Sequence, residues 1–186
     1  TEWTAFSAEI LLTGKFDSYE QRLFDEWTKL ANPQSPIRGG VSTQAALNNL
    51  RNGLKPPQSG KQNPHYFDDG AMSRAVPIGI ICAGQPEMAT RLAEMDAAVT
   101  NSEDGVWAAQ ALAVAISLVC SGKSVNEAIN EAYKYLPESS WIRRTVDEAM
   151  SLVEKNDSVF SILPEIQNKI VNREYRKKKN SILNLT

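Results

Sequence analysis

Residues 106–120 constrain the fold of this chain most, because the run VWAAQALAVAISLVC is apolar on every helical face except at Gln110 and Ser117. A helix without a polar face is stable only when other helices surround it. The run is also too short and too rich in alanine to cross a membrane, which requires about 20 apolar residues. It therefore predicts the buried central helix of a helical bundle.

Helical periodicity covers most of the remaining sequence, whereas the alternation typical of strands is scarce. Apolar residues recur at helical spacing in residues 3–13, 19–30, 43–54, 72–83, 86–99, 124–137, 141–153 and 159–171. The sequence therefore predicts an all-α fold, an orthogonal multi-helix bundle around the alanine-rich helix 106–120.

Residues of the capping type predict where several of these helices begin. Asp17 with Glu20 and Ser124 with Glu127 have the spacing of a capping box, in which each side chain bonds the other residue's backbone. The helix that ends near residue 54 has two candidate caps, Ser42 and Thr43. Residues 56–64 are polar and rich in proline, so they predict a loop.

Length and composition predict one globular domain with a real core. The chain has 186 residues, of which 42% are hydrophobic and 23% charged. We expect a single helical domain over residues 1–172 and a basic tail over residues 173–186. The formal net charge of -2 gives no reason to expect nucleic acid or an anionic membrane as a partner.

The few histidines and cysteines limit which metal and catalytic sites the chain can form, and the cysteines suggest a reducing compartment. His65 is the only histidine, which excludes a histidine-rich metal site and speaks against a serine or cysteine triad. Cys82 and Cys120 both lie in apolar helical sequence, where a free cysteine is ordinarily a small buried hydrophobe. We therefore expect buried, reduced thiols and a cytoplasmic protein.

A polar turn with two carboxylates comes directly before the apolar run 71–82. Asp68, Asp69 and Gly70 form this turn, and the free N–H groups of a starting helix favour an anion there. The two carboxylates would repel a phosphate unless a cation or ribose hydroxyls intervened. The aspartates could equally be ordinary capping residues, and Gly39 and Gly40 could serve either a ligand or a tight turn.

Two segments of the chain resemble the ADP-ribosylglycohydrolase family. They are GAMSRAVPIGIICAG (70–84) and PEMATRLAEMDAAVTNSEDGVWAAQALAVAIS (86–117). The family has a "GAAMR…P.G" segment, a helix of the type "A…A…DA…TH" and an alanine-rich helix, in the same order. Arg74 falls one place late relative to the family's GAMR, and Asn101 stands where the family has a histidine. The likeness covers residues 1–172.

This resemblance implies an all-α fold and an activity. The implied reaction is Mg²⁺-assisted hydrolysis of the glycosidic bond of ADP-ribose on a modified protein or small molecule. Two metal ions would orient the ribose hydroxyls and a water molecule. The residues that the resemblance assigns to the ADP-ribose pocket are Gly39, Gly40, Asp68, Asp69, Gly70, Met72 and Asn101.

The family's metal-binding motifs, however, predict that this chain lacks most of the ligands that catalysis would need. The metal carboxylates come from a TDDT motif and from a C-terminal DxDT motif. We expect Thr1 to be the last residue of TDDT, so that the chain alone would not fully ligate Mg²⁺. The chain would then be a fragment, a split product that needs a complementing polypeptide, or a degenerate homologue. The alternative is a non-catalytic helical module that binds ADP-ribose or a protein.

Overall fold

The computed structural model describes residues 2–32, 34, 37–156 and 158–170. Every regular element in these ranges is a helix, which confirms the predicted all-α fold. The chain divides into two compact units, one within residues 1–140 and the other from residue 141 onward. The single domain expected over residues 1–172 stays a prediction, and the basic tail 173–186 lies outside the described residues.

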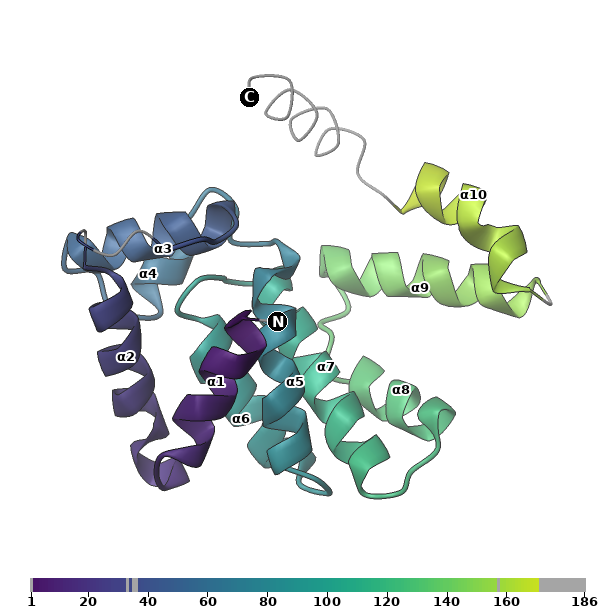
Figure 1. Ribbon diagram of the computed structural model, residues 1–186. Helices are drawn as coiled ribbons and strands as arrows, with labels where there is room; N and C mark the ends of the chain where they lie inside the picture. The colour runs from purple at the N-terminus through teal and green to yellow at the C-terminus, as the bar shows by residue number, and fades with distance from the viewer. Residues whose placement is uncertain (1, 33, 35–36, 157, 171–186) are drawn as a thin grey trace. The chain divides into compact units, whose positions relative to one another are not determined.

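The first unit is a bundle of helices around α7, as predicted (Figure 1). Its elements are α1 (Glu2–Leu12), η1 (Phe16–Ser18), α2 (Tyr19–Leu30), α3 (Val41–Arg51), α4 (Gln58–Lys61), η2 (Asp69–Ala71), α5 (Met72–Ile81), α6 (Pro86–Ala97), α7 (Asp104–Cys120) and α8 (Val125–Tyr133). Helix α7 packs against α5, α6 and α8, while α1 packs against α5, and α2 contacts α3 and α6.

Helices α5 and α7 approach each other closely because Gly79 has no side chain. A Cβ atom at Gly79 would lie 2.6 Å from the Cβ of Ile116 and 2.7 Å from the carbonyl oxygen of Ala113. No larger residue fits without moving one helix. Helix α7 ends at Cys120, and the chain turns away at Gly122, whose φ of +93° is a conformation that glycine adopts without strain.

Pro77 lies inside α5, where its missing N–H group leaves the carbonyl oxygen of Ser73 without its helical partner. The hydroxyl of Thr4 in α1 donates a hydrogen bond to this same oxygen at 2.9 Å. The side chain of one helix therefore satisfies the backbone of the next. This bond fixes the start of α1 against α5.

One of the two predicted capping boxes is confirmed and the other is wrong. Ser124 caps α8, because its hydroxyl accepts from the N–H of Glu127 and its own N–H donates to the Glu127 carboxylate. The Ser124 hydroxyl, which donates to the Glu127 carboxylate at 2.7 Å, and then the Ser124 N–H lower the pKa of Glu127. Asp17, by contrast, lies inside η1, and α2 begins at Tyr19 with Ser18 as an N-cap that makes no side-chain cap.

The segment predicted as a loop, residues 56–64, contains the short helix α4. Its turn is buried on one side, since Ser59 donates a hydrogen bond to the carbonyl oxygen of Val99 at 2.9 Å. Gly60 lies directly against the end of α6, and a Cβ there would lie 2.5 Å from the carbonyl oxygen of Ala98. This segment therefore supports α6 and the turn that follows it.

The two cysteines have different environments, so the prediction that both are buried is half wrong. Cys82 is buried, and this burial raises the pKa of its thiol. Cys120 is exposed because it is the last residue of α7, beyond the part that α5 and α6 cover. Within the described ranges, no helix is long and apolar enough to span a membrane.

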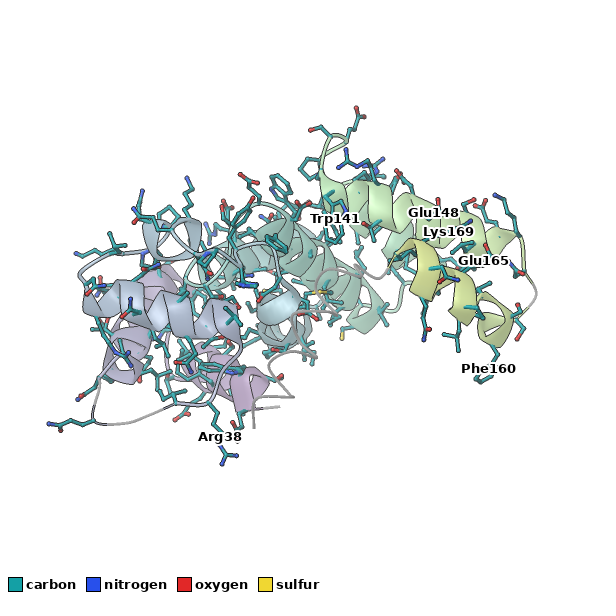
Figure 2. All side chains as sticks on the ribbon, turned by 90° about the horizontal axis from the view of Figure 1, so that it is seen from above. Arg38, Trp141, Glu148, Phe160, Glu165 and Lys169 are labelled. Carbon is teal, nitrogen blue, oxygen red and sulfur yellow. The ribbon has the colours of Figure 1, made fainter. Side chains whose placement is uncertain are left out.

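The second unit contains α9 (Trp141–Glu154) and α10 (Val159–Lys169), which pack against each other. Leu152 of α9 and Ile162 of α10 are buried. Lys169 lies 3.2 Å from the carboxylates of both Glu148 and Glu165, so it joins the two helices (Figure 2). The hydrogen bond to Glu148 and then that to Glu165 raise the pKa of Lys169.

Candidate ligand-binding corner

Three segments of the first unit meet at one place, which we call the corner: the start of α3, residues 63–70 and residues 100–105. The side-chain amide of Asn63 donates to the carbonyl oxygens of Ser42 at 2.9 Å and of Thr100 at 2.7 Å. The N–H of Ser102 donates to the carbonyl oxygen of Tyr66 at 2.9 Å. These bonds bring together most of the predicted site residues from distant parts of the chain.

Asp68 has the capping role that the sequence left open. Its Oδ1 accepts hydrogen bonds from the N–H of Gly70 and from Nδ2 of Asn101, both at 3.0 Å. Asp68 is half-buried, whereas the neighbouring Asp69 is exposed. Met72, the first residue of α5, is also half-buried. One aspartate is therefore fixed by the protein while the other faces solvent.

Asn101 ties residues 66–68 to the end of α6. Its side chain is 1% exposed, and its Nδ2 also lies 2.9 Å from the carbonyl oxygen of Asp68 and 3.1 Å from that of Tyr66. Gly105 permits this arrangement, because a Cβ there would lie 2.7 Å from Nδ2 of Asn101. A direct contact between Asn101 and substrate stays a prediction.

A buried ion pair supports the corner from within the bundle. Arg74 of α5 is 0% exposed, and its Nε lies 2.5 Å from Oδ1 of Asp96 in α6. Its Nη2 donates to the hydroxyl of Thr100 at 2.8 Å and to the backbone oxygen of Asp96 at 3.2 Å. The guanidinium carbon lies 5.2 Å from the ring of Trp27, a cation–π contact.

The other oxygen of Asp96 is bonded to α1 and to α2. Its Oδ2 accepts from the hydroxyl of Ser7 at 2.9 Å and from that of Tyr19 at 3.1 Å. Burial, and then the negative charge of Asp96, raise the pKa of Tyr19. Tyr19 therefore stays protonated and remains a hydrogen-bond donor. Four helices of the bundle thus meet at one carboxylate.

The start of α3 is open to solvent. Gly40 is its N-cap and supplies no side-chain cap, and a Cβ there would meet nothing within 4 Å. The prediction that Ser42 or Thr43 caps this helix is wrong, because both residues lie inside its first turn and are buried. Gly39 is exposed, and the side chain of Arg38 extends away from the helices (Figure 2).

Two local features of the corner cost stability. The hydroxyl oxygen of Ser42 is buried without a hydrogen-bond partner among the described residues, a penalty of about 1–3 kcal/mol. It faces Gly70, whose Cβ would lie 2.8 Å away. Glu103 has a φ of +47°, which is strained for a residue with a side chain. Such features accumulate at functional sites.

A cavity of about 550 Å³ lies elsewhere in the first unit, between the start of α2, residues 55–57 and α6. Its lining carries charge of both signs, including Glu20, Arg91 and Glu94, together with apolar side chains such as Phe24. None of the predicted site residues lines it. The corner and this cavity are separate features of the bundle.

The part of the chain that the structure describes contains no group of three His, Cys, Asp or Glu side chains that could hold a metal ion. Thr1, the predicted metal ligand, lies outside the described residues. The described residues therefore do not fit the Mg²⁺ ions that the resemblance implies.

The supporting residues of the corner were not found by sequence reasoning. Arg74 and Asp96 are separated by 22 positions, and Asn63 and Thr100 by 37, so no local pattern pairs them. A weak signal was present, since Arg74 is a charged residue within an apolar helical run. Charged residues are almost never fully buried unless they are paired.

Comparison with known proteins identifies a family. The sequence model of the family described as ADP-ribosylglycohydrolase matches residues 1–178. No match was found among curated proteins or among solved structures. The family match spans both compact units and confirms the resemblance that residues 70–117 suggested.

Proposed function

The chain belongs to the ADP-ribosylglycohydrolase family, and we propose that its corner binds the ADP-ribose part of a modified protein or small molecule for hydrolysis of the glycosidic bond. The observation that carries this proposal is the uncapped start of α3 at Gly40 beside open space. Free N–H groups at a helix start bind phosphate groups well.

The chemistry of the corner matches the parts of ADP-ribose. Gly40 leaves room for a diphosphate against the start of α3, and the cation of Arg38 is close in sequence. Gly39 instead packs against the side chain of Thr43, where a Cβ would lie 2.6 Å from Cγ2. The carboxylates of Asp68 and Asp69 suit ribose hydroxyls, which donate hydrogen bonds to them. A phosphate bound directly at the two aspartates would be repelled.

Hydrolysis needs groups that the described residues do not supply. We propose that Mg²⁺ and its carboxylates are completed by residues outside those described or by a complementing polypeptide. The free thiols of Cys82 and Cys120 suit a reducing compartment such as the cytoplasm.

The second candidate function is binding of ADP-ribose without cleavage. One observation favours this non-catalytic function. It depends on aligning the family's TDDT motif with residues 1–4, so that its two threonines correspond to Thr1 and Thr4. The sequence TEWT then places Glu2 and Trp3 at the two aspartate positions. Trp3 stacks on Trp27 with ring centroids 5.1 Å apart, so this position packs an aromatic ring rather than offering a ligand to a metal.

Calorimetry and turnover separate these two functions. The purified chain should bind ADP-ribose with measurable heat. If it is an enzyme, it should also release ADP-ribose from a modified peptide in a Mg²⁺-dependent manner. Binding that Mg²⁺ does not change, with no turnover, supports the non-catalytic module. No detectable binding at millimolar ADP-ribose would contradict both candidates.

A carboxylate introduced at the start of α3 is expected to weaken ADP-ribose binding without unfolding the protein. In Gly40→Asp the new side chain caps α3, which should leave stability unchanged or raise it by about 0.3–1 kcal/mol. The same carboxylate occupies the N–H groups and repels a diphosphate. We expect the dissociation constant measured by calorimetry to rise about tenfold or more, the effect of 1.4 kcal/mol.

Gln85→Asp is the matched control. Gln85 is an exposed N-cap of α6 that also lacks a side-chain cap, so the substitution adds the same charge at another helix start. This variant should bind ADP-ribose like the wild type. Equal weakening in both variants would indicate a general effect of charge, and no weakening in Gly40→Asp would exclude the start of α3 as the diphosphate site.

A further inference from the structure

The hydroxyl of Thr100 has a fixed direction because of its neighbour Arg74. A guanidinium group can only donate hydrogen bonds. In the 2.8 Å bond between Nη2 of Arg74 and Oγ1 of Thr100, the threonine oxygen is therefore the acceptor. The single hydroxyl hydrogen of Thr100 is then directed at Oδ1 of Asn101, 2.5 Å away. The charge buried at Arg74 thereby determines which way Thr100 donates.

The side-chain amide of Asn101 is oriented from both of its ends. Its oxygen faces the Thr100 hydroxyl, and its nitrogen faces three acceptors: the carbonyl oxygens of Tyr66 and Asp68, and Oδ1 of Asp68. A flipped amide would place an oxygen against those three acceptors and leave the hydroxyl hydrogen of Thr100 without its acceptor. Only one orientation therefore satisfies both sides.

We infer that Arg74 and Thr100 are positioning residues, which fix the Asp68 carboxylate through Asn101. The three hydrogen bonds run in one direction, from the buried cation to the half-buried carboxylate. Bonds in such a chain polarise one another and strengthen the last of them. The final bond holds Asp68 in the orientation in which it also caps Gly70.

The consequence for the ligand rests on the proposed function. If Asp68 receives a ribose hydroxyl at the corner, a fixed carboxylate avoids the loss of conformational freedom that binding would otherwise require. Arg74 and Thr100 are both 0% exposed, so neither touches the ligand. Thr100 acts through Asn101 and Asp68, while Nη1 of Arg74 also donates to the carbonyl oxygen of Gly70 at 3.4 Å.

Two substitutions at Thr100 test the inference. Thr100→Val keeps the shape but removes the hydroxyl, whereas Thr100→Ser keeps the hydroxyl. We expect the ADP-ribose dissociation constant to rise about tenfold or more in Thr100→Val, the size expected from loss of hydrogen bonds to charged groups, and to stay near the wild-type value in Thr100→Ser. The side-chain amide protons of Asn101, followed by NMR, should exchange slowly with solvent in the wild type and rapidly in Thr100→Val.

Tyr19→Phe is the control for a general loss of stability. It removes one hydrogen bond from the other side of Asp96, at a distance from Asn101 along the network. We expect a loss of stability with unchanged Asn101 exchange and unchanged affinity. Equal loss of affinity in Tyr19→Phe and Thr100→Val would overturn the inference.

The wild type alone also tests the inference, should Thr100→Val fail to fold. Rapid exchange of the Asn101 amide protons in the wild type would overturn it. Wild-type protein that binds no ADP-ribose but protects these protons would contradict the proposed function and still support the positioning of Asp68 by Thr100.

Discussion

Replacing Asp96 by alanine should lower the free energy of unfolding by about 3–5 kcal/mol, the usual cost of removing one partner from a buried ion pair. Arg74 would keep a charge with 0% exposure, and the hydroxyls of Ser7 and Tyr19 would lose their acceptor. Each unsatisfied buried group adds to the penalty. Urea denaturation followed by circular dichroism measures this loss.

Two further variants distinguish the effect of breaking the ion pair from the effect of removing any carboxylate or any side-chain volume. Asp25→Ala removes a carboxylate on the surface of α2 and should change stability by less than about 0.5 kcal/mol. The double variant Arg74→Met, Asp96→Leu replaces both charges by apolar groups and should be more stable than Asp96→Ala. A cost below about 1 kcal/mol for Asp96→Ala would mean that water reaches the pair and screens it.

The ion pair links the stability of the bundle to the geometry of the corner. One carboxylate receives hydrogen bonds from α1, α2 and α5, and the same guanidinium that it holds begins the chain of bonds to Asp68. A buried polar group that loses its partner lowers the stability of the folded state, so few other side-chain arrangements are compatible with this network. Removing Asp96 should therefore weaken ADP-ribose binding as well as stability, whereas Tyr19→Phe, which keeps the bond between Arg74 and Asp96, should lower stability alone.

Local patterns predicted the helices well because a helix depends on neighbours three and four positions apart. The capping box of Ser124 and Glu127 was correct for the same reason. The box expected at Asp17 failed because the turn η1 intervenes, and α4 was missed because it is held by burial of Ser59 and Gly60 rather than by its own sequence. Tertiary packing decided both of these cases.

The corner could be predicted only in outline. The resemblance brought Gly40, Asp68 and Asn101 to attention, and the structure places them in segments that meet. The residues that hold them there, such as Arg74 and Thr100, are paired across 26 positions by the packing of α5 on α6. The charge of Arg74 within an apolar run signals that it is paired, but a single sequence does not name the partner, because hydrogen bonds between elements follow from the fold and not from spacing.

Gly60→Ala is expected to destabilise the protein although alanine favours helices. In α4 the added methyl group would lie 2.5 Å from the carbonyl oxygen of Ala98 and would also press on the backbone of Asn101. Backbone atoms cannot turn aside as a flexible side chain can. We expect a net loss of about 1–3 kcal/mol in urea denaturation, typical of overpacking, and a weaker affinity for ADP-ribose in calorimetry.

Gly40→Ala is the comparison for Gly60→Ala, because its methyl group points into open space and its φ of -63° suits any residue. Its stability should stay within about 0.5 kcal/mol of the wild type. If Gly60→Ala instead stabilises the protein by the roughly 1 kcal/mol that helix propensity predicts, α4 can move away from α6. Asn101 would then lose its contact with α4 and be held by Thr100, Tyr66 and Asp68, and the corner would be less rigid than its contacts indicate.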